Sequence, residues 1–342
     1  MSERREATPA AGREAWRLCV APMMDWTDRH CRWFHRQLAP HARLYTEMVA
    51  TGAVVFGDAD RHLAFSPEER PVAVQFGGCD PDHLARCAEL AEARGYDEVN
   101  LNCGCPSPRV KAGAFGAVLM LEPENVAACV AAMRRATSLP VTVKCRIGVD
   151  DHDRLDFLCR FVETVARAGC EVFVVHARKA WLEGLSPREN REIPPLDHER
   201  VYRLKEAFPE LVIVLNGGIR TPEEALSHLA QVDGVMIGRE AYANPWVLPA
   251  FERALFDPAF GPTRRAVLER VVAYAREMHG REGVPVHAVA RHLLGLANGL
   301  PGARHFRRIL SEETRGREVD PRILLDAWAR VRDPEEVALT HA

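Results

Sequence analysis

The sequence has 342 residues, of which 47% are hydrophobic and 27% are charged, with 45 basic and 48 acidic side chains. These proportions are typical of a folded globular protein and exclude an intrinsically disordered chain. The formal net charge of −3 disfavours a protein that coats nucleic acid with its whole surface, because such proteins are usually basic.

The first residues, 1–15, mix charges and contain no apolar segment, so we expect a disordered extension rather than a secretory signal. No apolar stretch approaches the roughly 20 residues that span a bilayer, so we expect no membrane association. The ten cysteines are irregularly spaced and form no CxxC pair. Reduced thiols in a cytoplasmic protein are the simplest interpretation of this pattern.

Short apolar runs alternate with helical patterns through residues 16–245. The runs are rich in Val, Ile and Leu, as is typical of parallel strands covered on both faces. Eight such strands over this length predict a (β/α)₈ TIM barrel, an α/β fold of about 250 residues, with a doubly wound open sheet as the alternative. We predict strands at 18–22, 44–47, 72–76, 98–102, 141–145, 172–176, 212–216 and 234–237, and helices that include 81–94, 123–136, 155–168 and 222–229.

The pattern changes after Asn244-Pro245, where we place a domain boundary. Residues 246–342 contain helical patterns interrupted by glycine and proline, and no strand pattern. We therefore predict a small all-helical C-terminal domain. Its expected helices are 264–279, 286–298, 303–311 and 321–331.

Polar or sulfur-containing side chains end all of the predicted strands. In parallel barrels, the carboxyl ends of the strands carry the active site. Each such residue could be structural by itself, but packing does not explain so many together. They are Met23-Met24, Glu47, Gln75, Asn102, Lys144, His176, Asn216-Gly217-Gly218 and Gly238-Arg239.

The last two of these sets predict a phosphate site. They end the seventh and eighth predicted strands, where barrel enzymes often bind phosphate through loop amides. Glycines allow the backbone to approach the phosphate closely, and Arg239 would add a charged contact. No GxGxxG fingerprint and no P-loop occurs, so a Rossmann dinucleotide site and a P-loop NTPase are disfavoured.

Two further strand-end residues could carry chemistry. Lys144 ends a strand covered on both faces, so its ammonium must find a negative partner or lose its charge. One interpretation is an ion pair with Glu47, and the other is a cation next to an electron-rich cofactor. His176 could likewise be structural, but at a barrel mouth we expect it to contact a ligand.

The segment 100–107 combines two asparagines with two thiols. Asn100 and Asn102 are two apart and therefore share one face of a strand. The following loop contains Cys103 and Cys105. No companion cluster of Cys or His has zinc spacing, so we expect no metal, and either thiol could be a nucleophile or a general acid. A Ser-His-Asp hydrolase is not supported because no GxSxG motif is present.

Several of these motifs, in this order, resemble the tRNA-dihydrouridine synthases. The similarity extends over about residues 18–310, and the stretches 176–197 and 291–310 are similar to the A subfamily in particular. The motifs are Ala21-Pro22-Met23-Met24-Asp25-Trp26-Thr27-Asp28, Gln75-Phe76-Gly77-Gly78, Asn100–Ser107, Lys144-Cys145-Arg146-Ile147-Gly148, Asn216-Gly217-Gly218 and Gly238-Arg239.

The resemblance implies a TIM barrel that binds FMN tightly, with NADPH as the reductant, followed by a helical tRNA-binding domain. Reduced FMN would pass a hydride to C6 of a uracil at tRNA positions 20 and 20a, and a cysteine would protonate C5. Cys105, directly before Pro-Ser, matches that proton donor, whereas Cys103 stands where the family more often has an aliphatic residue. Because a proton donor must be a thiol, Cys105 should not have a strongly depressed pKa. The residues matching the FMN site are Pro22, Met23, Met24, Gln75, Lys144, His176, Asn216, Gly217, Gly218, Gly238 and Arg239.

The same resemblance implies contacts with tRNA. A uracil in folded tRNA must be extruded to reach a barrel mouth, and other contacts must offset that cost. We expect tRNA to be the partner, with no DNA, no membrane and no obligate protein partner, and we expect a monomer. The positions matching tRNA contacts in the family are Asn102, Arg188, Arg191, Arg304 and Arg307.

Two other functions remain as alternatives. A flavin-dependent barrel that acts on a free metabolite, such as a dihydroorotate-type oxidoreductase, would share the phosphate site and the polar strand ends. It would not need a helical domain with an arginine face. A non-catalytic tRNA-binding protein is the second alternative, and the presence of Cys105, Lys144 and His176 argues against it.

Overall fold

The computed structural model describes residues 12–107, 113, 115–316 and 318–334. These residues form two compact units. The first contains the described residues up to Asp25 and those from Ala42 to Gly238, and the second contains Trp26–His41 and the described residues from Arg239 onward. The division after Gly238 precedes the predicted boundary at Asn244-Pro245, and it assigns 26–41 to the second unit. Periodicity alone does not show that assignment.

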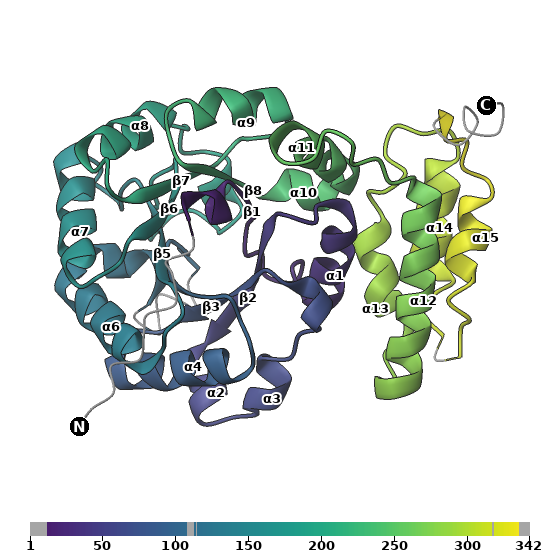
Figure 1. Ribbon diagram of the computed structural model, residues 1–342, viewed down its shortest axis with the longest axis horizontal. Helices are drawn as coiled ribbons and strands as arrows, with labels where there is room; N and C mark the ends of the chain where they lie inside the picture. Colours follow the sequence, from purple (N-terminus) through teal and green to yellow (C-terminus); the bar gives the residue numbers. More distant parts are fainter. Residues whose placement is uncertain (1–11, 108–112, 114, 317, 335–342) are drawn as a thin grey trace. The chain divides into compact units, whose positions relative to one another are not determined.

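The first unit is a closed barrel of eight parallel strands (Figure 1). Each strand pairs with the next, and the last pairs with the first. The predicted TIM barrel is therefore confirmed, and the open-sheet alternative is wrong. The strands are β1 (Leu18–Val20), β2 (Arg43–Ala50), β3 (Val72–Gly77), β4 (Glu98–Cys103), β5 (Val141–Arg146), β6 (Val172–His176), β7 (Val212–Asn216) and β8 (Gly234–Ile237).

Helices surround these strands (Figure 1). Two begin where Pro follows an N-cap residue: Asp80 accepts a hydrogen bond from the His83 amide, and Thr221 accepts one from the Glu224 amide. The helices of this unit are α2 (Thr51–Val55), α3 (Ala59–His62), α4 (Pro81–Ala93), α6 (Pro123–Ala136), α7 (Leu155–Arg167), α8 (His198–Ala207) and α9 (Pro222–Leu229), with short 3₁₀ helices at η1 (Arg13–Trp16), η2 (Pro67–Glu69), η3 (Gly116–Leu121) and η4 (Glu189–Arg191).

The extension expected at residues 1–15 is only partly described. Residues 1–11 lie outside the described residues. Residues 13–15 belong to η1, which buries Trp16 against the barrel, so the expectation of disorder is wrong for these three. Burial of the Trp16 indole holds this turn against the barrel. The charged, alanine-containing sequence before Trp16 does not by itself predict this contact.

The barrel interior changes character between its strands. The buried core contains Tyr45 on β2, Ala73 on β3, and alternate valines on β6 and β7. On β4 and β5 the corresponding alternate positions are polar instead. Because alternate residues of a strand share a face, these polar residues line the interior together. They are Glu98, Asn100 and Asn102 on β4, and Thr142, Lys144 and Arg146 on β5.

The second unit is all-helical in its described residues. The predicted helix 286–298 is wrong beyond Ala290, because α13 gives way to a 3₁₀ turn and Gly295 lies against the Ala243 backbone, where a side chain would clash with the Ala243 carbonyl. None of the described helices is long and apolar enough to cross a membrane. The helices are α1 (Arg29–Leu38), α10 (Arg239–Ala243), α11 (Leu248–Leu255), α12 (Arg264–Glu282), α13 (Val286–Ala290), α14 (Ala303–Glu312) and α15 (Ile323–Trp328), with η5 (Pro245–Val247) and η6 (Arg291–Leu293).

Candidate active site

Asn102 holds the loop that carries Cys105. Its side-chain Oδ1 accepts hydrogen bonds from the backbone amides of Gly104 (3.0 Å) and Cys105 (2.9 Å). The Cys105 carbonyl then accepts a hydrogen bond from the Ala117 amide at 2.9 Å. The loop is thus fixed on both sides of the thiol, just beyond the carboxyl end of β4.

The two asparagines of β4 do share one face, as their spacing predicts. Both contact Gln75 on β3. The Asn102 amide donates to Gln75 Oε1 at 2.7 Å, and Gln75 Nε2 donates to Asn100 Oδ1 at 2.8 Å. All three side chains are buried. Both the oxygen and the nitrogen of the Asn102 side chain are therefore engaged within the protein.

Lys144 lies on β5 with an amide oxygen as its partner. Its Nζ donates to Asn216 Oδ1 at 3.0 Å, and Asn216 Nδ2 donates in turn to the Met236 carbonyl at 2.8 Å. Burial, with the neighbouring Arg146, lowers the pKa of Lys144 to about 8. No ion pair of Lys144 occurs among the described residues, so the interpretation as a Glu47 pair is wrong. Glu47 instead accepts a hydrogen bond from the Asp25 amide at 2.5 Å.

Arg146 is buried, lies next to half-buried Lys144, and is a second cation at this end of the strands that was not predicted from the sequence. Its guanidinium donates to the carbonyls of Gly104 (2.8 Å), Lys179 (2.9 Å) and Asn190 (3.0 Å). Burial lowers its pKa to about 10. The period of two along β5 places Arg146 on the same face as Lys144, and this pattern could have identified it. It joins the loop of Cys105 to the segment that follows β6.

The two thiols of the β4 loop differ in burial. Cys103 is fully buried, and burial raises its pKa well above the ordinary value. Cys105 is half-buried, and both Lys144 and Arg146 are close enough to interact electrostatically with it. Cys105 is therefore the thiol that a ligand at the carboxyl ends of the strands could reach.

Gly217 and Gly218 make a turn that no other residue fits without strain. Their φ angles are +124° and +83°, in the region that favours glycine. A Cβ atom at Gly217 would lie 2.9 Å from a methyl carbon of Leu196 and 3.0 Å from Cδ2 of His176. The imidazole of His198 donates to the Gly217 carbonyl at 2.8 Å. The turn lies against half-buried His176. His176 ends β6 and is paired in register with Asn216 on β7.

The remaining strand-end residues are more exposed. Pro22 and Met23 are half-buried after β1, and Met24 is exposed. A Cβ atom at Gly238 would meet nothing closer than Ala21 at 3.9 Å, so the backbone there is open. Arg239, the next residue, begins α10 in the second unit and is exposed.

The four predicted tRNA-contact arginines are all exposed. Arg188 precedes η4 and Arg191 ends it, in the segment after β6 as predicted. Arg304 and Arg307 lie on α14 of the second unit, opposite its buried residues Phe306, Ile309 and Leu310. Their spacing of three correctly predicts one exposed helix face.

The described residues contain no group of three or more His, Cys, Asp or Glu side chains placed to hold a metal ion. All ten cysteines are free. The site therefore consists of side-chain amides, half-buried Lys144, buried Arg146, the half-buried thiol of Cys105 and a glycine turn.

Comparison with known proteins identifies relatives over nearly the whole chain. The family model described as "Dihydrouridine synthase (Dus)" matches residues 19–330. A tRNA-dihydrouridine(20/20a) synthase of Pasteurella multocida (strain Pm70) is 57% identical over 297 residues, covering 86% of this chain and 90% of that protein. The enzyme of the same name from Escherichia coli (strain K12) is 54% identical over 318 residues, covering 93% and 92%.

Among solved structures, a complex of 2-naphthoyl-CoA reductase with 2-naphthoyl-CoA has a similar fold, with a TM-score of 0.52 and 12% sequence identity. The match covers 74% of this chain, and this chain spans 55% of the length of that one. At this identity the likeness extends to the fold alone.

Proposed function

Because this chain belongs to the dihydrouridine synthase family, whose members are oxidoreductases that reduce uridine in tRNA, we propose that it forms 5,6-dihydrouridine at positions 20 and 20a of the tRNA D-loop, with FMN as its flavin and NADPH as its reductant. The positions follow the names of relatives that are 53–57% identical. Neither the free-metabolite oxidoreductase nor the non-catalytic tRNA-binding protein is favoured by these relatives.

The observation that carries this proposal is the Lys144 ammonium. It is held at the carboxyl ends of the strands by a neutral amide, 3.0 Å from Asn216 Oδ1, and has no ion pair among the described residues. Lys144 is half-buried. A cation partly withdrawn from water with only a neutral partner is costly, and an electron-rich ligand would offset that cost. A flavin ring fits this requirement, with the Gln75 amide and His176 as further polar contacts.

The glycines fit the phosphate end of FMN. Gly217 and Gly218 have positive φ angles, and a Cβ atom at either would clash with neighbouring side chains. At Gly238 no atom lies close to the backbone on the side where a Cβ would stand. Such segments let main-chain amides approach a phosphate directly. Arg239, which follows Gly238, would contribute its guanidinium. Pro22, Met23 and Met24 would contact the ring from the end of β1.

Bound FMN, reduced by NADPH, would supply the hydride that adds to C6 of the uracil. The chain's own contribution is the proton: Cys105 Sγ–H would donate to C5 as a general acid. Asn102 and Arg146 hold the backbone of this loop through Gly104 and Cys105, which fixes the direction from which the proton arrives. Lys144 would stabilise negative charge next to the ring.

Exposed arginines would bind the tRNA while its uracil is extruded. Extruding a base costs a few kcal/mol, which backbone contacts must offset. Arg188 and Arg191 follow β6, and Arg304 and Arg307 share a face of α14. Arginine suits phosphate recognition because its planar guanidinium forms paired hydrogen bonds. Asn102 would contact the substrate through the second hydrogen of its amide, because the first is used by Gln75.

The test is to purify the full chain, measure its flavin content, and incubate it with NADPH and tRNA from cells that lack dihydrouridine. Mapping dihydrouridine by mass spectrometry should find it at positions 20 and 20a. Free uridine and dihydroorotate serve as control substrates. Formation of product from either of these, with none in tRNA, would overturn the proposal.

We further propose that the protein acts in the cytoplasm as a monomer, on tRNA rather than DNA, without an obligate protein partner. Light scattering during size-exclusion chromatography should give the mass of one chain. Activity of the purified chain alone would support independence from a protein partner, whereas activity that requires a cell extract would contradict it.

A further inference from the structure

A continuous chain of hydrogen bonds runs from the Cys105 loop to the opposite end of the barrel. We call it the amide column, formed by Asn102, Gln75, Asn100, Thr142 and Glu98. Beyond the bonds given above, Asn100 Nδ2 donates to Thr142 Oγ1 at 2.7 Å, and Thr142 Oγ1 lies 2.5 Å from Glu98 Oε1. Every member is buried, and Glu98, Asn100 and Thr142 are fully so.

The two ends of the column fix its direction. The backbone amides of Gly104 and Cys105 can only donate hydrogen bonds, and an ionised Glu98 can only accept them. Each amide or hydroxyl between them must therefore donate toward Glu98. Reversing any one side chain would place two donors or two acceptors face to face in a buried setting, so a single arrangement satisfies the whole column.

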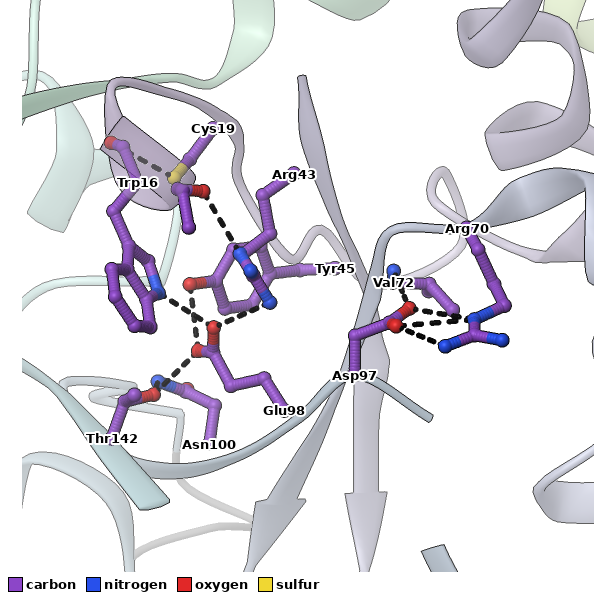
Figure 2. Close-up of polar contacts among 11 residues, drawn as sticks. Trp16, Cys19, Arg43, Tyr45, Arg70, Val72, Asp97, Glu98, Asn100 and Thr142 are labelled. Atoms are coloured by element: carbon purple, nitrogen blue, oxygen red, sulfur yellow. Dashed lines mark hydrogen bonds and ion pairs between the residues drawn. The ribbon is translucent and has the colours of Figure 1, made fainter. Parts of the chain in front are cut away.

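Glu98 is bound as an ionised carboxylate would be (Figure 2). Trp16 Nε1 donates to its Oε2 at 2.7 Å, and the Tyr45 hydroxyl donates to its Oε1 at 2.8 Å. The Arg43 guanidinium lies 3.2 Å from Oε2. Trp16, Tyr45 and Thr142 thus donate hydrogen bonds to Glu98, Arg43 supplies a positive charge beside it, and the described residues place no acceptor there that a protonated carboxyl could use.

We propose that Glu98 is a positioning residue for Cys105, and that it acts through the amide column across the barrel. It sets which way Asn100, Gln75 and Asn102 point, and so keeps Asn102 Oδ1 facing the Cys105 loop. Without the hydroxyl of Thr142, the column loses its link to Glu98, and the amides are held from the loop end alone, so they reverse more readily. A reversed Asn102 would present its NH₂ group to the two loop amides and release the loop. This inference rests on the proposed role of Cys105 as the proton donor.

The test compares two substitutions that each remove one hydroxyl from Glu98 Oε1. Thr142→Val interrupts the column at nearly constant volume, whereas Tyr45→Phe removes a donor that lies outside it. Thr142→Ser restores the hydroxyl and should restore the wild-type behaviour. The first measurement is the rate at which iodoacetamide alkylates Cys105 in the full-length protein, followed by peptide mass spectrometry, with fully buried Cys103 as an internal reference.

For Thr142→Val, alkylation of Cys105 should be faster by about fivefold or more, comparable to the loss of one hydrogen bond. In dihydrouridine formation, kcat should fall by roughly tenfold, as expected for a displaced general acid, while KM for tRNA stays unchanged. Thr142→Ser and Tyr45→Phe should stay within about twofold of wild type in both measurements. If Thr142→Val does not fold, Thr142→Cys offers a weaker donor and should give an intermediate rate.

Equal alkylation rates in all variants and the wild type would overturn the inference. So would equal changes in Thr142→Val and Tyr45→Phe, because they would show only a general loosening around Glu98. The alkylation assay needs neither flavin nor tRNA. A wild-type protein that forms no dihydrouridine would therefore refute the proposed function, while the alkylation rates would still decide whether the column holds the loop.

Discussion

The two ends of the barrel hold buried charge in opposite ways. At the amino ends of the strands, the floor, Glu98 and Arg43 lie 3.2 Å apart and form an ion pair. At the carboxyl ends, the mouth, Lys144 and Arg146 have only amide or carbonyl oxygens as described partners. The same fold thus neutralises charge at one end and leaves positive charge uncompensated at the other.

This difference distinguishes a structural ion pair from a candidate binding site. A buried charge that already has its counter-charge needs nothing more, and removing one partner leaves the other exposed to a large desolvation cost. A buried cation held by neutral oxygens lowers stability until an anionic or electron-rich ligand arrives. The mouth therefore has the features of a binding site, and the floor has those of a structural support. Substitutions at the two ends should have opposite effects on stability.

The largest effect should come from removing the accessible thiol at the mouth. Cys105→Ala should lower dihydrouridine formation by about 10²–10⁴-fold, the usual contribution of a positioned general acid. Flavin content and tRNA affinity should be retained, because the side chain is small and half-buried. Single-turnover assays with flavin spectra measure both. Cys103→Ala is the matched control, and retained turnover in Cys105→Ala but not in Cys103→Ala would reverse the assignment of the two thiols.

At the floor, Arg43→Met should destabilise the protein by about 3–5 kcal/mol, because it leaves Glu98 buried without a counter-charge. Urea unfolding followed by circular dichroism measures this change. The control is Arg167→Met, which removes an exposed arginine paired with Glu163 on α7 and should cost no more than about 1 kcal/mol. An equal decrease in the free energy of unfolding in the two variants would mean that the floor pair stabilises the protein no more than a surface pair does.

The barrel could be predicted from the sequence because strand and helix patterns depend on residues that are neighbours in the chain. Apolar runs and N-cap residues such as Asp80 and Thr221 depend only on neighbouring residues, so the strands and main helices are found where expected. The polar strand ends likewise follow from their position in each run. Asn100 and Asn102 are placed on one face by the period of two, and Gln75 is singled out as a strand end.

The contacts that organise the site could not be predicted in the same way. Thr142 and Glu98 are 44 residues apart in sequence, and their contact depends on the register between β4 and β5. Periodicity shows that each faces inward but not which residues meet there. The Glu47 interpretation of Lys144 fails for this reason, since opposite charges alone do not reveal that Asn216 is nearer. Arg146 was not predicted because the expected strand ends at residue 145, whereas β5 extends one residue further.

Lys144→Met should stabilise the flavin-free protein, whereas Arg43→Met at the floor should destabilise it. Burial lowers the pKa of Lys144 to about 8 from an unfolded value near 10.5. Below pH 8 the side chain is protonated in both states, so its burial penalty is fully present. The penalty disappears as pH rises from 8 to 10.5, where the unfolded chain binds more protons. In the flavin-free protein near pH 7, the substitution should raise the free energy of unfolding by about 1–3 kcal/mol.

Urea unfolding of wild type and Lys144→Met at several pH values between 7 and 10.5 tests this expectation. The stability difference should shrink as pH rises, and other titrating groups cancel in the comparison. Flavin affinity should fall in the same variant. A variant less stable than wild type at pH 7 would show that the ammonium is satisfied without a ligand, and that mouth and floor do not differ as described.

The smallest effect concerns cations that are exposed rather than buried. Replacing Arg304 and Arg307 together with Ala should leave stability nearly unchanged, because both lie on the solvent face of α14. If each contacts one tRNA phosphate, the slope of log K against log salt should become shallower by roughly 1.4–1.8, since each neutralised phosphate releases counterions. Arg308→Ala is the control, because that neighbouring arginine is paired with Glu312 (3.3 Å) and Glu313 (3.1 Å). An unchanged slope in the double variant would remove this face from the tRNA interface. A shallower slope with unchanged stability would complete the comparison: cations buried at the mouth lower stability without a ligand, whereas cations on the surface affect only the binding of tRNA.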